Sequence, residues 1–432
     1  MNLKSNISTR SIVASLIVLT SSCSQNEQLQ ATATTAYSNA YIIDGRGGEP
    51  IVKGTLVVEN GKLVAVGPSN EISVPNGATT VDLAGKFIIP GMINAHGHVG
   101  NVKGLEKGVW SRENTIAQLK LYAKYGITTV VSLGSDQPEA KFIRDEQSNP
   151  TLDRARFFYA GNIIIANTPE SAKQMVNDMV AIDADFIKIK VDDNLGTVQK
   201  MSIGVAEAAI KEAHKYNLPV AAHIWYLDDA KKLLKNGLDI VGHSVRDQAV
   251  DKEFIDLIKE KNGTYIPTLV REVSTYVYQE IPEFFSDPFF LREADPQVLD
   301  QLKDPTRMKT IWANKNTQIY KQALKIAQAN LKTLSDNGVR IAFGTDSGPP
   351  ARFQGYYEHL ELELMEQAGM SPMKILVSAT GAAAENMGLK NIGTLEPGNW
   401  ADFVVLRENP LDSILNSRTI ENVIVAGNEI DR

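Results

Sequence analysis

Residues 88–98 read Ile-Ile-Pro-Gly-Met-Ile-Asn-Ala-His-Gly-His, an apolar run that stops at two histidines. The apolar part, residues 88–93, predicts a buried β-strand. Because side chains two positions apart on a strand point to the same face, His96 and His98 can reach one ion together. Strands that end in such polar residues are typical of (β/α)8 barrels, whose active sites form where the strands end.

The middle of the chain repeats this alternation of strand and helix. Further strand-like runs occur at residues 129–133, 157–160, 186–191, 220–222, 240–241, 265–269 and 341–343, with helical patterns between them. An open, doubly wound sheet also alternates, but eight similar units over about 250 residues favour closure. We therefore predict an α/β protein with a (β/α)8 TIM barrel over residues 88–380.

The two ends of the chain are rich in short β-strand patterns instead. Near the N-terminal end, Asn60-Gly61 lies between two such runs and is a strong hairpin signal. Near the C-terminal end, residues 403–406 and 423–425 have the same character. We expect residues 37–87 and 381–432 to meet in one composite β-sandwich domain.

The first residues resemble an export signal. Residues 1–23 combine a basic head, a short apolar stretch and small residues, ending at Cys23, the only cysteine. A lipoprotein signal peptide acylated at Cys23 is the favoured interpretation; a plainly cleaved signal and a cytosolic chain are the alternatives. Polar residues 24–36 would form a tether. We expect an exported, periplasmic or outer-membrane protein that meets the membrane only through this anchor.

The composition is that of an ordinary globular protein. Of 432 residues, 43% are hydrophobic and 22% are charged, which excludes a disordered or fibrous chain. The net charge of −7 offers no polycationic surface, so we expect no nucleic-acid partner. A small-molecule substrate is expected, and a homo-oligomer stays open.

Polar residues that can bind metal follow several predicted barrel strands: His96, His98, His223, His243 and Asp346. A single core histidine is usually structural, but four at the ends of strands of one barrel, with an aspartate, indicate a metal site. Imidazole and carboxylate ligands with open positions favour zinc over manganese, cobalt or iron.

Lys188 lies inside the fourth predicted strand, and Lys190 shares its face. A buried lysine is costly unless it is paired or neutralised. One interpretation is an ion pair with Asp192 or Asp193. The other is a lysine carboxylated by carbon dioxide, which would bridge two metal ions as an anion.

These residues stand in motifs that resemble the amidohydrolase superfamily, in particular its imidazolonepropionase-like and prolidase-like (Xaa-Pro dipeptidase-like) members. The resemblance covers residues 40–430. It rests on Pro90-Gly91-Met92-Ile93-Asn94-Ala95-His96-Gly97-His98, Ala184-Asp185-Phe186-Ile187-Lys188, Val220-Ala221-Ala222-His223, Gly237-Leu238-Asp239-Ile240-Val241-Gly242-His243, Gly344-Thr345-Asp346 and the tail from Ala379-Thr380-Gly381 to Ala401-Asp402-Phe403.

The resemblance implies a role for each candidate residue. It implies two divalent metal ions, of which zinc is the first expectation, and metal-activated hydroxide as the nucleophile. Carboxylated Lys188 would bridge the two ions. The remaining ligands divide into His96 and His98 on the α metal, His223 and His243 on the β metal, and Asp346 on the α metal and as acid/base.

The sequence departs from the family pattern in three places. Asn94 stands where the family often has an aspartate. Residues 191–194 replace a Gly-Gly that often follows the lysine. Residues 161–163 lack a histidine that many of the dipeptidases carry in this region. The metal ligands are therefore well supported, and the substrate pocket is not.

The predicted activity is hydrolysis of an amide bond in a dipeptide or an N-acyl amino acid with a bulky apolar side. An aromatic segment, residues 270–307, would cover the site and supply the apolar wall. Arg271 could hold a substrate carboxylate, and Tyr226 could touch the substrate. The alternatives are a lactone or carbamate ester hydrolase, a mononuclear deaminase or cyclic-imide hydrolase, and a binding protein that has lost catalysis.

Overall fold

The computed structural model describes residues 34–432. The predicted signal peptide with Cys23, and the predicted tether up to residue 33, lie outside the described residues. Strand β1 (Thr35–Ile42) includes the last two residues of the predicted tether, because Thr35 and Ala36 already pair with the neighbouring strand β2.

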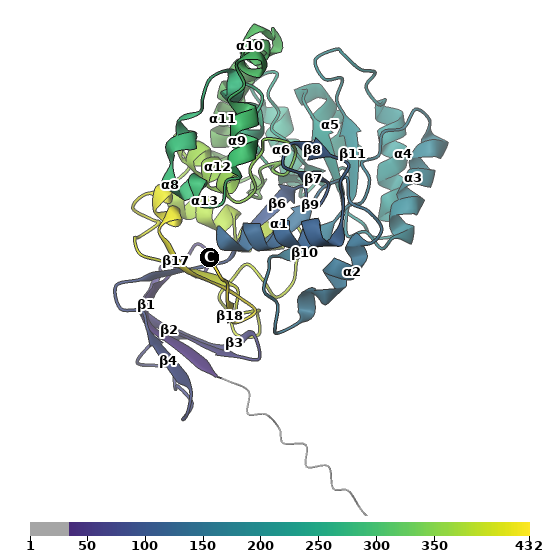
Figure 1. Cartoon of the computed structure of the whole chain (residues 1–432). Helices are drawn as coiled ribbons and strands as arrows, with labels where there is room; N and C mark the ends of the chain where they lie inside the picture. Colours follow the sequence, from purple (N-terminus) through teal and green to yellow (C-terminus); the bar gives the residue numbers. More distant parts are fainter. Residues whose placement is uncertain (1–33) are drawn as a thin grey trace, which may run out of the picture. The chain divides into compact units, whose positions relative to one another are not determined.

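Strands from both ends of the chain form one eight-stranded sheet (Figure 1). Strand β5 joins the two ends: it runs parallel to β1 on one side and antiparallel to β16 on the other. Asn60 and Gly61 both have positive φ between β2 and β3, which confirms the predicted hairpin. The arrangement of this sheet as two packed layers stays a prediction. Its strands are β1, β2 (Ile51–Glu59), β3 (Lys62–Pro68), β4 (Thr79–Asp82), β5 (Phe87–Pro90), β16 (Phe403–Leu406), β17 (Ile420–Val425) and β18 (Asn428–Glu429).

Eight parallel strands form the TIM-barrel-like part of the fold. They fall into a three-stranded and a five-stranded sheet, and parallel bridges between Gly97 and Ser347 and between Ile164 and Ile189 connect the edges of the two sheets. The predicted barrel is confirmed at this level. The strands are β6 (Met92–Gly97), β9 (Ile127–Ser132), β10 (Arg156–Tyr159), β11 (Ile187–Val191), β12 (Val220–Ile224), β13 (Ile240–Val241), β14 (Thr264–Tyr265) and β15 (Arg340–Ile341).

Residues 88–93 do not form one barrel strand as predicted. The run is divided at Gly91, so that β5 belongs to the sheet of the chain ends and β6 to the barrel. A Cβ atom at Gly91 would lie 2.0 Å from Thr128 Oγ1, so only glycine allows the chain to pass between the two sheets here. The predicted boundary between residues 87 and 88 therefore cuts through β5.

Helix α14 (Gly381–Asn386) corrects the other predicted boundary. Its Ala383 and Ala384 pack with Ile93 and Ala221 in the core inside the barrel, not with the sheet of the chain ends. Small apolar residues fit this narrow space, which explains why a segment next to the C-terminal strands joins the barrel.

The remaining helices lie mostly between the barrel strands, and several begin at a side-chain cap, as Ser111 does for α1 and Asp251 for α6. The helices are α1 (Arg112–Lys124), α2 (Ala140–Asp145), α3 (Pro169–Ala181), α4 (Ile203–His214), α5 (Leu227–Lys235), α6 (Lys252–Glu260), α11 (Asn316–Asp336), α12 (Tyr356–Gln367) and α13 (Pro372–Ser378), with 3-10 turns at Glu146–Ser148 and Ile414–Arg418 and the small hairpin β7 (Val102–Lys103) and β8 (Glu106–Lys107).

The aromatic segment over residues 270–307 forms short helices that pack against α12. Phe284 and Phe290 contact Tyr356, and Phe285 and Phe290 stack on each other. These rings pack against one another and against α12. They therefore no longer support the prediction that this segment forms an apolar wall for the substrate. The short helices of this region are α7 (Leu269–Val273), α8 (Pro288–Leu291), α9 (Pro296–Leu302) and α10 (Pro305–Ala313), with 3-10 turns at Val277–Gln279 and Glu283–Ser286.

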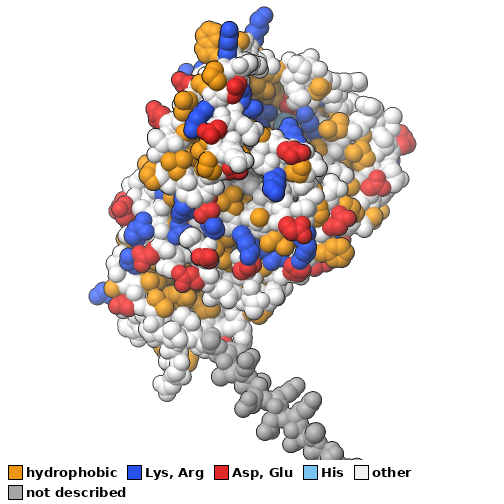
Figure 2. All heavy atoms as spheres, in the orientation of Figure 1, with side chains coloured by type: hydrophobic (Ala, Val, Ile, Leu, Met, Phe, Trp, Pro, Cys, Tyr) orange, Lys and Arg blue, Asp and Glu red, His pale blue; other side chains and the backbone are white. Residues whose placement is uncertain are grey.

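Figure 2 shows basic and acidic side chains interspersed over one face of the protein, without a continuous basic patch on that face. Within residues 34–432, no helix has the length and apolar character needed to span a bilayer.

Candidate active site

The predicted metal ligands come together where the barrel strands end. His96 lies in β6, Lys188 in β11 and His223 in β12, whereas His243 and Asp346 follow β13 and β15. His96, Lys188, His243 and Asp346 are at most 5% exposed, so the site lies within the protein rather than on its surface.

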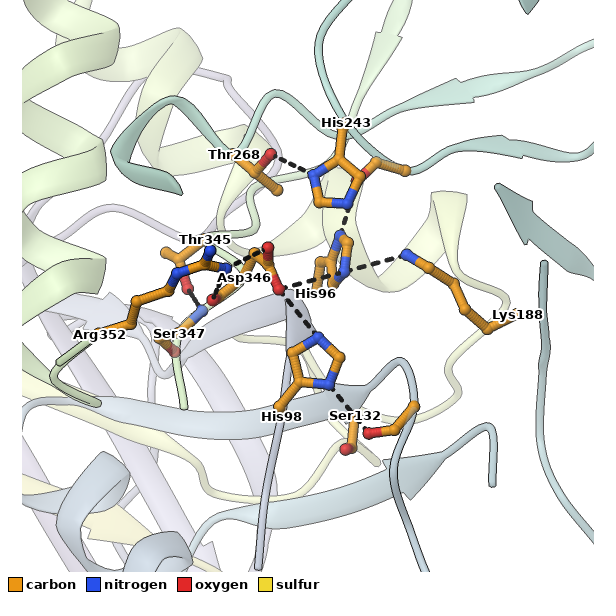
Figure 3. Close-up of polar contacts among 12 residues, drawn as sticks. His96, His98, Ser132, Lys188, His243, Thr268, Thr345, Asp346, Ser347 and Arg352 are labelled. Carbon is orange, nitrogen blue, oxygen red and sulfur yellow. Dashed lines mark hydrogen bonds and ion pairs between the residues drawn. The ribbon is translucent and has the colours of Figure 1, made fainter. Parts of the chain in front are cut away.

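The first half of the site consists of His96, His98 and Asp346 (Figure 3). Asp346 Oδ1 lies 2.8 Å from His98 Nε2 and 3.9 Å from His96 Nε2. One ligand atom from each of the three residues lies within 4.8 Å of the others. This spacing suits a single divalent ion held by two imidazoles and a carboxylate.

The other ring nitrogens of these two histidines are held by the backbone. His96 Nδ1 lies 2.6 Å from the carbonyl oxygen of Gly242, and His98 Nδ1 lies 2.9 Å from that of Gly134. Because a carbonyl oxygen only accepts, both Nδ1 atoms must carry the proton. Each Nε2 is then directed into the site, as in histidines that bind metal, with His98 Nε2 beside Asp346 and His96 Nε2 beside Lys188.

The second half of the site consists of His243 and His223. The His243 ring lies 4.6 Å from the His96 ring and 4.1 Å from the His223 ring, measured between centroids. His243 Nδ1 contacts Thr268 Oγ1 at 2.8 Å, and His223 Nε2 contacts Asp192 Oδ2 at 2.8 Å. His243 Nε2 and His223 Nδ1 are thereby left for a ligand, so the donor set fits metal in this half too.

Lys188 lies between the two halves. Its Nζ lies 3.0 Å from His96 Nε2, and burial lowers the pKa of this lysine to about 7. The ion pair with Asp192 or Asp193 does not form, because Asp192 binds His223 and Asp193 accepts a hydrogen bond from Tyr226. Gly242 makes room for the lysine, since a Cβ atom there would lie 3.2 Å from Nζ.

Lys190, the other candidate lysine on the same strand, does not lie between the two halves of the site. Its Nζ donates to Asn194 Oδ1 at 3.0 Å. The choice of Lys188 over Lys190 therefore agrees with the geometry.

Asp346 has a cationic partner that sequence reasoning missed. Arg352 NH1 lies 2.5 Å from Asp346 Oδ2. Burial raises the pKa of the Asp346 carboxyl, but Arg352 and His98 outweigh this effect and hold that pKa well below its usual range. Asp346 itself has a φ of 57°, in the left-handed region that is costly for a residue with a side chain.

The two predicted substrate residues lie near the second half of the site. Tyr226 donates its hydroxyl hydrogen to Asp193 Oδ1 at 3.0 Å. Arg271 is 8% exposed and pairs through NH1 with Glu272 Oε1 at 3.0 Å. Both side chains are therefore engaged by carboxylates of the protein itself.

The barrel and the metal-ligand arrangement define a class of protein, and the comparisons identify its family. The chain belongs to the amidohydrolase family, whose model matches residues 87–430. Ochratoxinase of Aspergillus niger is 27% identical over 271 residues, which is 60% of this chain and 48% of that protein. The chain thus spans about half the length of this relative.

Two further comparisons cover nearly the whole chain. The 5-methylthioadenosine/S-adenosylhomocysteine deaminase of Bacillus cereus is 23% identical over 455 residues, covering 92% of this chain and 93% of that protein. The solved structure of a proposed prolidase from Bifidobacterium longum superposes with a TM-score of 0.73 at 25% identity, covering 93% of this chain and 95% of that one.

Proposed function

We propose that this protein is a metal-dependent hydrolase that cleaves the amide bond of a dipeptide or an N-acyl amino acid at a binuclear zinc centre. One observation carries the proposal: each of four histidines has one ring nitrogen held by a backbone carbonyl or a side chain outside the ligand set, so that the other nitrogen faces the site. The similarity to a proposed prolidase and to ochratoxinase supports the choice of an amide substrate.

The two halves of the site would each hold one ion. His96, His98 and Asp346 would hold the first, and His223 and His243 the second. When bound, the two ions would lower the pKa of a water molecule and polarise the scissile carbonyl.

Lys188 would bridge the two halves after carboxylation. Its buried amine has no carboxylate partner in the ion pairs formed by residues 34–432, and it points at a histidine ring nitrogen. In the carboxylation step, the Nζ lone pair forms a bond to the carbon of carbon dioxide, one C=O π pair moves onto oxygen, and a proton passes from the nitrogen to water. The product is an anion, which removes the cost of an unpaired buried cation.

Asp346 would transfer the proton in the reaction. Its Oδ1 lies beside His98 and its Oδ2 beside Arg352, and the carboxylate would take a proton from the nucleophile and return it to the leaving nitrogen. Arg352 at Oδ2 keeps the group ionised before the reaction, which is the form a base needs.

Arg271 would hold the substrate carboxylate. Arg246 and Arg271 share one oxygen of Glu272, at 2.9 and 3.0 Å, so two buried cations face one buried anion. Arg246 NH1 is also tied to two backbone carbonyls, and both arginines keep donors without a hydrogen-bond partner among the described groups. Arg271 is the more exposed of the two, at 8% against 1%, so we assign the anionic substrate to it. Tyr226 would line the same side.

A panel of dipeptides, N-acyl amino acids, lactones and aryl carbamates tests the activity. We expect turnover of the first two classes only. Activity confined to lactones or carbamates would contradict the amide assignment.

The matched variants Arg271→Met and Arg418→Met test the carboxylate site. Arg418 is also a partly buried, ion-paired arginine with an unpartnered Nε, but it packs on α12 away from the site. We expect Arg271→Met to raise KM for a carboxylate-bearing substrate at least tenfold and to leave its carboxamide analogue unaffected. Arg418→Met should change neither, and equal effects of the two variants would refute the role.

A mononuclear deaminase is the second candidate, because His96, His98 and Asp346 alone form a compact three-ligand group and a deaminase relative covers most of the chain. Elemental analysis separates the candidates. One tightly held ion per chain, together with ammonia release from an aminopurine nucleoside, would favour the deaminase.

A further inference from the structure

Helix α12 presents two fully buried glutamates to the two halves of the site. Glu358 and Glu361 are both 0% exposed. The segment Glu358-His359-Leu360-Glu361 nevertheless has the polar composition that is typical of a helix on the protein surface. Neither contacts a metal ligand directly. Burying a carboxylate requires that its oxygens be satisfied by donors, so the partners of each glutamate show what it holds in place.

Glu358 holds both neighbours of Asp346. Its Oε1 accepts hydrogen bonds from Thr345 Oγ1 at 2.7 Å and from Ser347 Oγ at 2.6 Å. Asp346 lies between these two residues in the strained left-handed conformation. Such strain persists only where the surroundings fix it, and Glu358 supplies this restraint.

The same carboxylate reaches the first histidine. Asn94 Nδ2 donates to Glu358 Oε1 at 2.7 Å, while Asn94 Oδ1 accepts from the backbone N–H of His96 at 2.9 Å. An aspartate at residue 94 would place a second carboxyl group beside Glu358, a contact that the amide avoids. Glu358 thus connects the end of β6 with the loop that carries Asp346.

Glu361 holds the other side of the site. Its two oxygens accept the backbone N–H groups of Leu269 at 2.8 Å and of Val270 at 2.6 Å, at the start of α7. Thr268 is the N-cap of α7, but its hydroxyl contacts His243 Nδ1 and makes no cap hydrogen bond. Glu361 therefore caps α7 from another helix, in place of the Thr268 hydroxyl.

We propose that Glu358 and Glu361 are two separate positioning residues. Glu358 sets the position of Asp346 and therefore the rate of the chemical step. Glu361 sets α7, which carries Arg271, and therefore the binding of the substrate carboxylate. This division rests on the proposed amide hydrolysis, and it predicts that two similar buried glutamates on one helix affect different kinetic constants.

The test compares Glu358→Gln and Glu361→Gln, with Glu363→Gln as the control. Glu363 stands on the same helix in a partly exposed ion pair with Arg418 and contacts neither half of the site. Each variant is assayed as the metal-loaded full chain with an N-acyl amino acid and with its carboxamide analogue.

We expect Glu358→Gln to lower kcat by 10- to 100-fold for both substrates with KM within threefold, a magnitude typical of groups that orient ligands. Glu361→Gln should raise KM about tenfold for the carboxylate substrate only. Glu363→Gln should stay within twofold of the wild type. Equal losses in kcat and KM for both substrates in both buried variants would overturn the division and indicate a purely structural role.

A milder variant and crystal structures test the two roles even if a glutamate variant does not fold or no substrate of the panel is hydrolysed. If Glu358→Gln does not fold, Ser347→Ala removes one of its hydrogen bonds and should lower kcat alone, by a smaller factor. If no member of the panel is hydrolysed, the proposed function fails, but the positioning roles are still tested by structure. Glu358→Gln should move the Asp346 carboxylate away from His98, and Glu361→Gln should open the first turn of α7; unchanged positions would refute the roles.

Discussion

The two halves of the candidate metal site each contain a pair of histidines, but these pairs are held in different ways. His96 and His98 are oriented by backbone carbonyls, and their free nitrogens already face Asp346. His243 and His223 are oriented by the side chains of Thr268 and Asp192. Backbone atoms are fixed by the fold, whereas a side chain can turn or be replaced. The first half is therefore the better preorganised, and we expect it to bind its ion more tightly.

The largest effect is expected in the first half, from Asp346→Asn. The amide keeps an oxygen for His98 but cannot take up the proton, so kcat should fall about 10³-fold, within the range for removal of a general acid–base. Steady-state kinetics on the metal-loaded variant, with the metal content measured beside it, would check this. A variant that keeps its metal and more than a tenth of wild-type kcat would show that Asp346 is not the proton carrier.

A smaller effect is expected in the second half, from Asp192→Asn. The amide can turn its NH2 toward His223 Nε2 and release the ring from its present tautomer. The affinity of the second ion should fall by 10- to 100-fold, while that of the first stays within threefold. Titration of the apoprotein with Zn²⁺ measures both constants. A parallel loss at both ions would mean that the two halves are not independent.

The smallest effect concerns a buried histidine outside both halves. His359 on α12 uses both ring nitrogens, toward Ser417 Oγ at 3.0 Å and the Tyr125 carbonyl at 2.9 Å, so it has none left for a metal. Burial lowers its pKa to about 3. Below about pH 6.5 the imidazole is therefore protonated in the unfolded chain but stays neutral in the folded chain. The free energy of unfolding that the neutral, buried His359 contributes is present above that pH and is lost as the pH falls toward 3.

The measurement is urea unfolding of wild type and His359→Gln between pH 7 and pH 4.5. The wild type should lose more stability over this interval, by up to about 1.4 kcal/mol for each pH unit, and kcat at pH 7 should be unchanged in the variant. Identical pH dependence of the two proteins would show that His359 does not resist protonation. A large loss of kcat would give it a role in the site.

The predicted metal ligands could be recognised from the sequence because they stand in or soon after apolar strand runs. His96, His223 and Lys188 stand in or directly after runs of Ile, Val and Ala, where a polar side chain is costly without a purpose. The alternation of strand-like and helical segments likewise predicted the barrel, because each segment is recognised from residues that are close together in the sequence.

The residues that support the ligands could not be found in this way. Glu358 and Glu361 have the spacing of an ordinary amphipathic helix, and only tertiary packing buries them. Arg352 follows Asp346 in a glycine- and proline-rich loop whose path the sequence does not define. The division of residues 88–93 at Gly91 was missed for a related reason, since the contact with Thr128 that requires glycine comes from a different strand.

Stepwise reconstitution of the metal-free protein tests the two-ion amide hydrolase most directly. Zn²⁺ would be added to the apoprotein in the presence of bicarbonate, with metal content and hydrolysis of an N-acyl amino acid followed together. We expect the first equivalent to bind with little activity and turnover to rise with the second, to a plateau at two ions per chain. Full activity at one equivalent, or in the chelated protein, would contradict it.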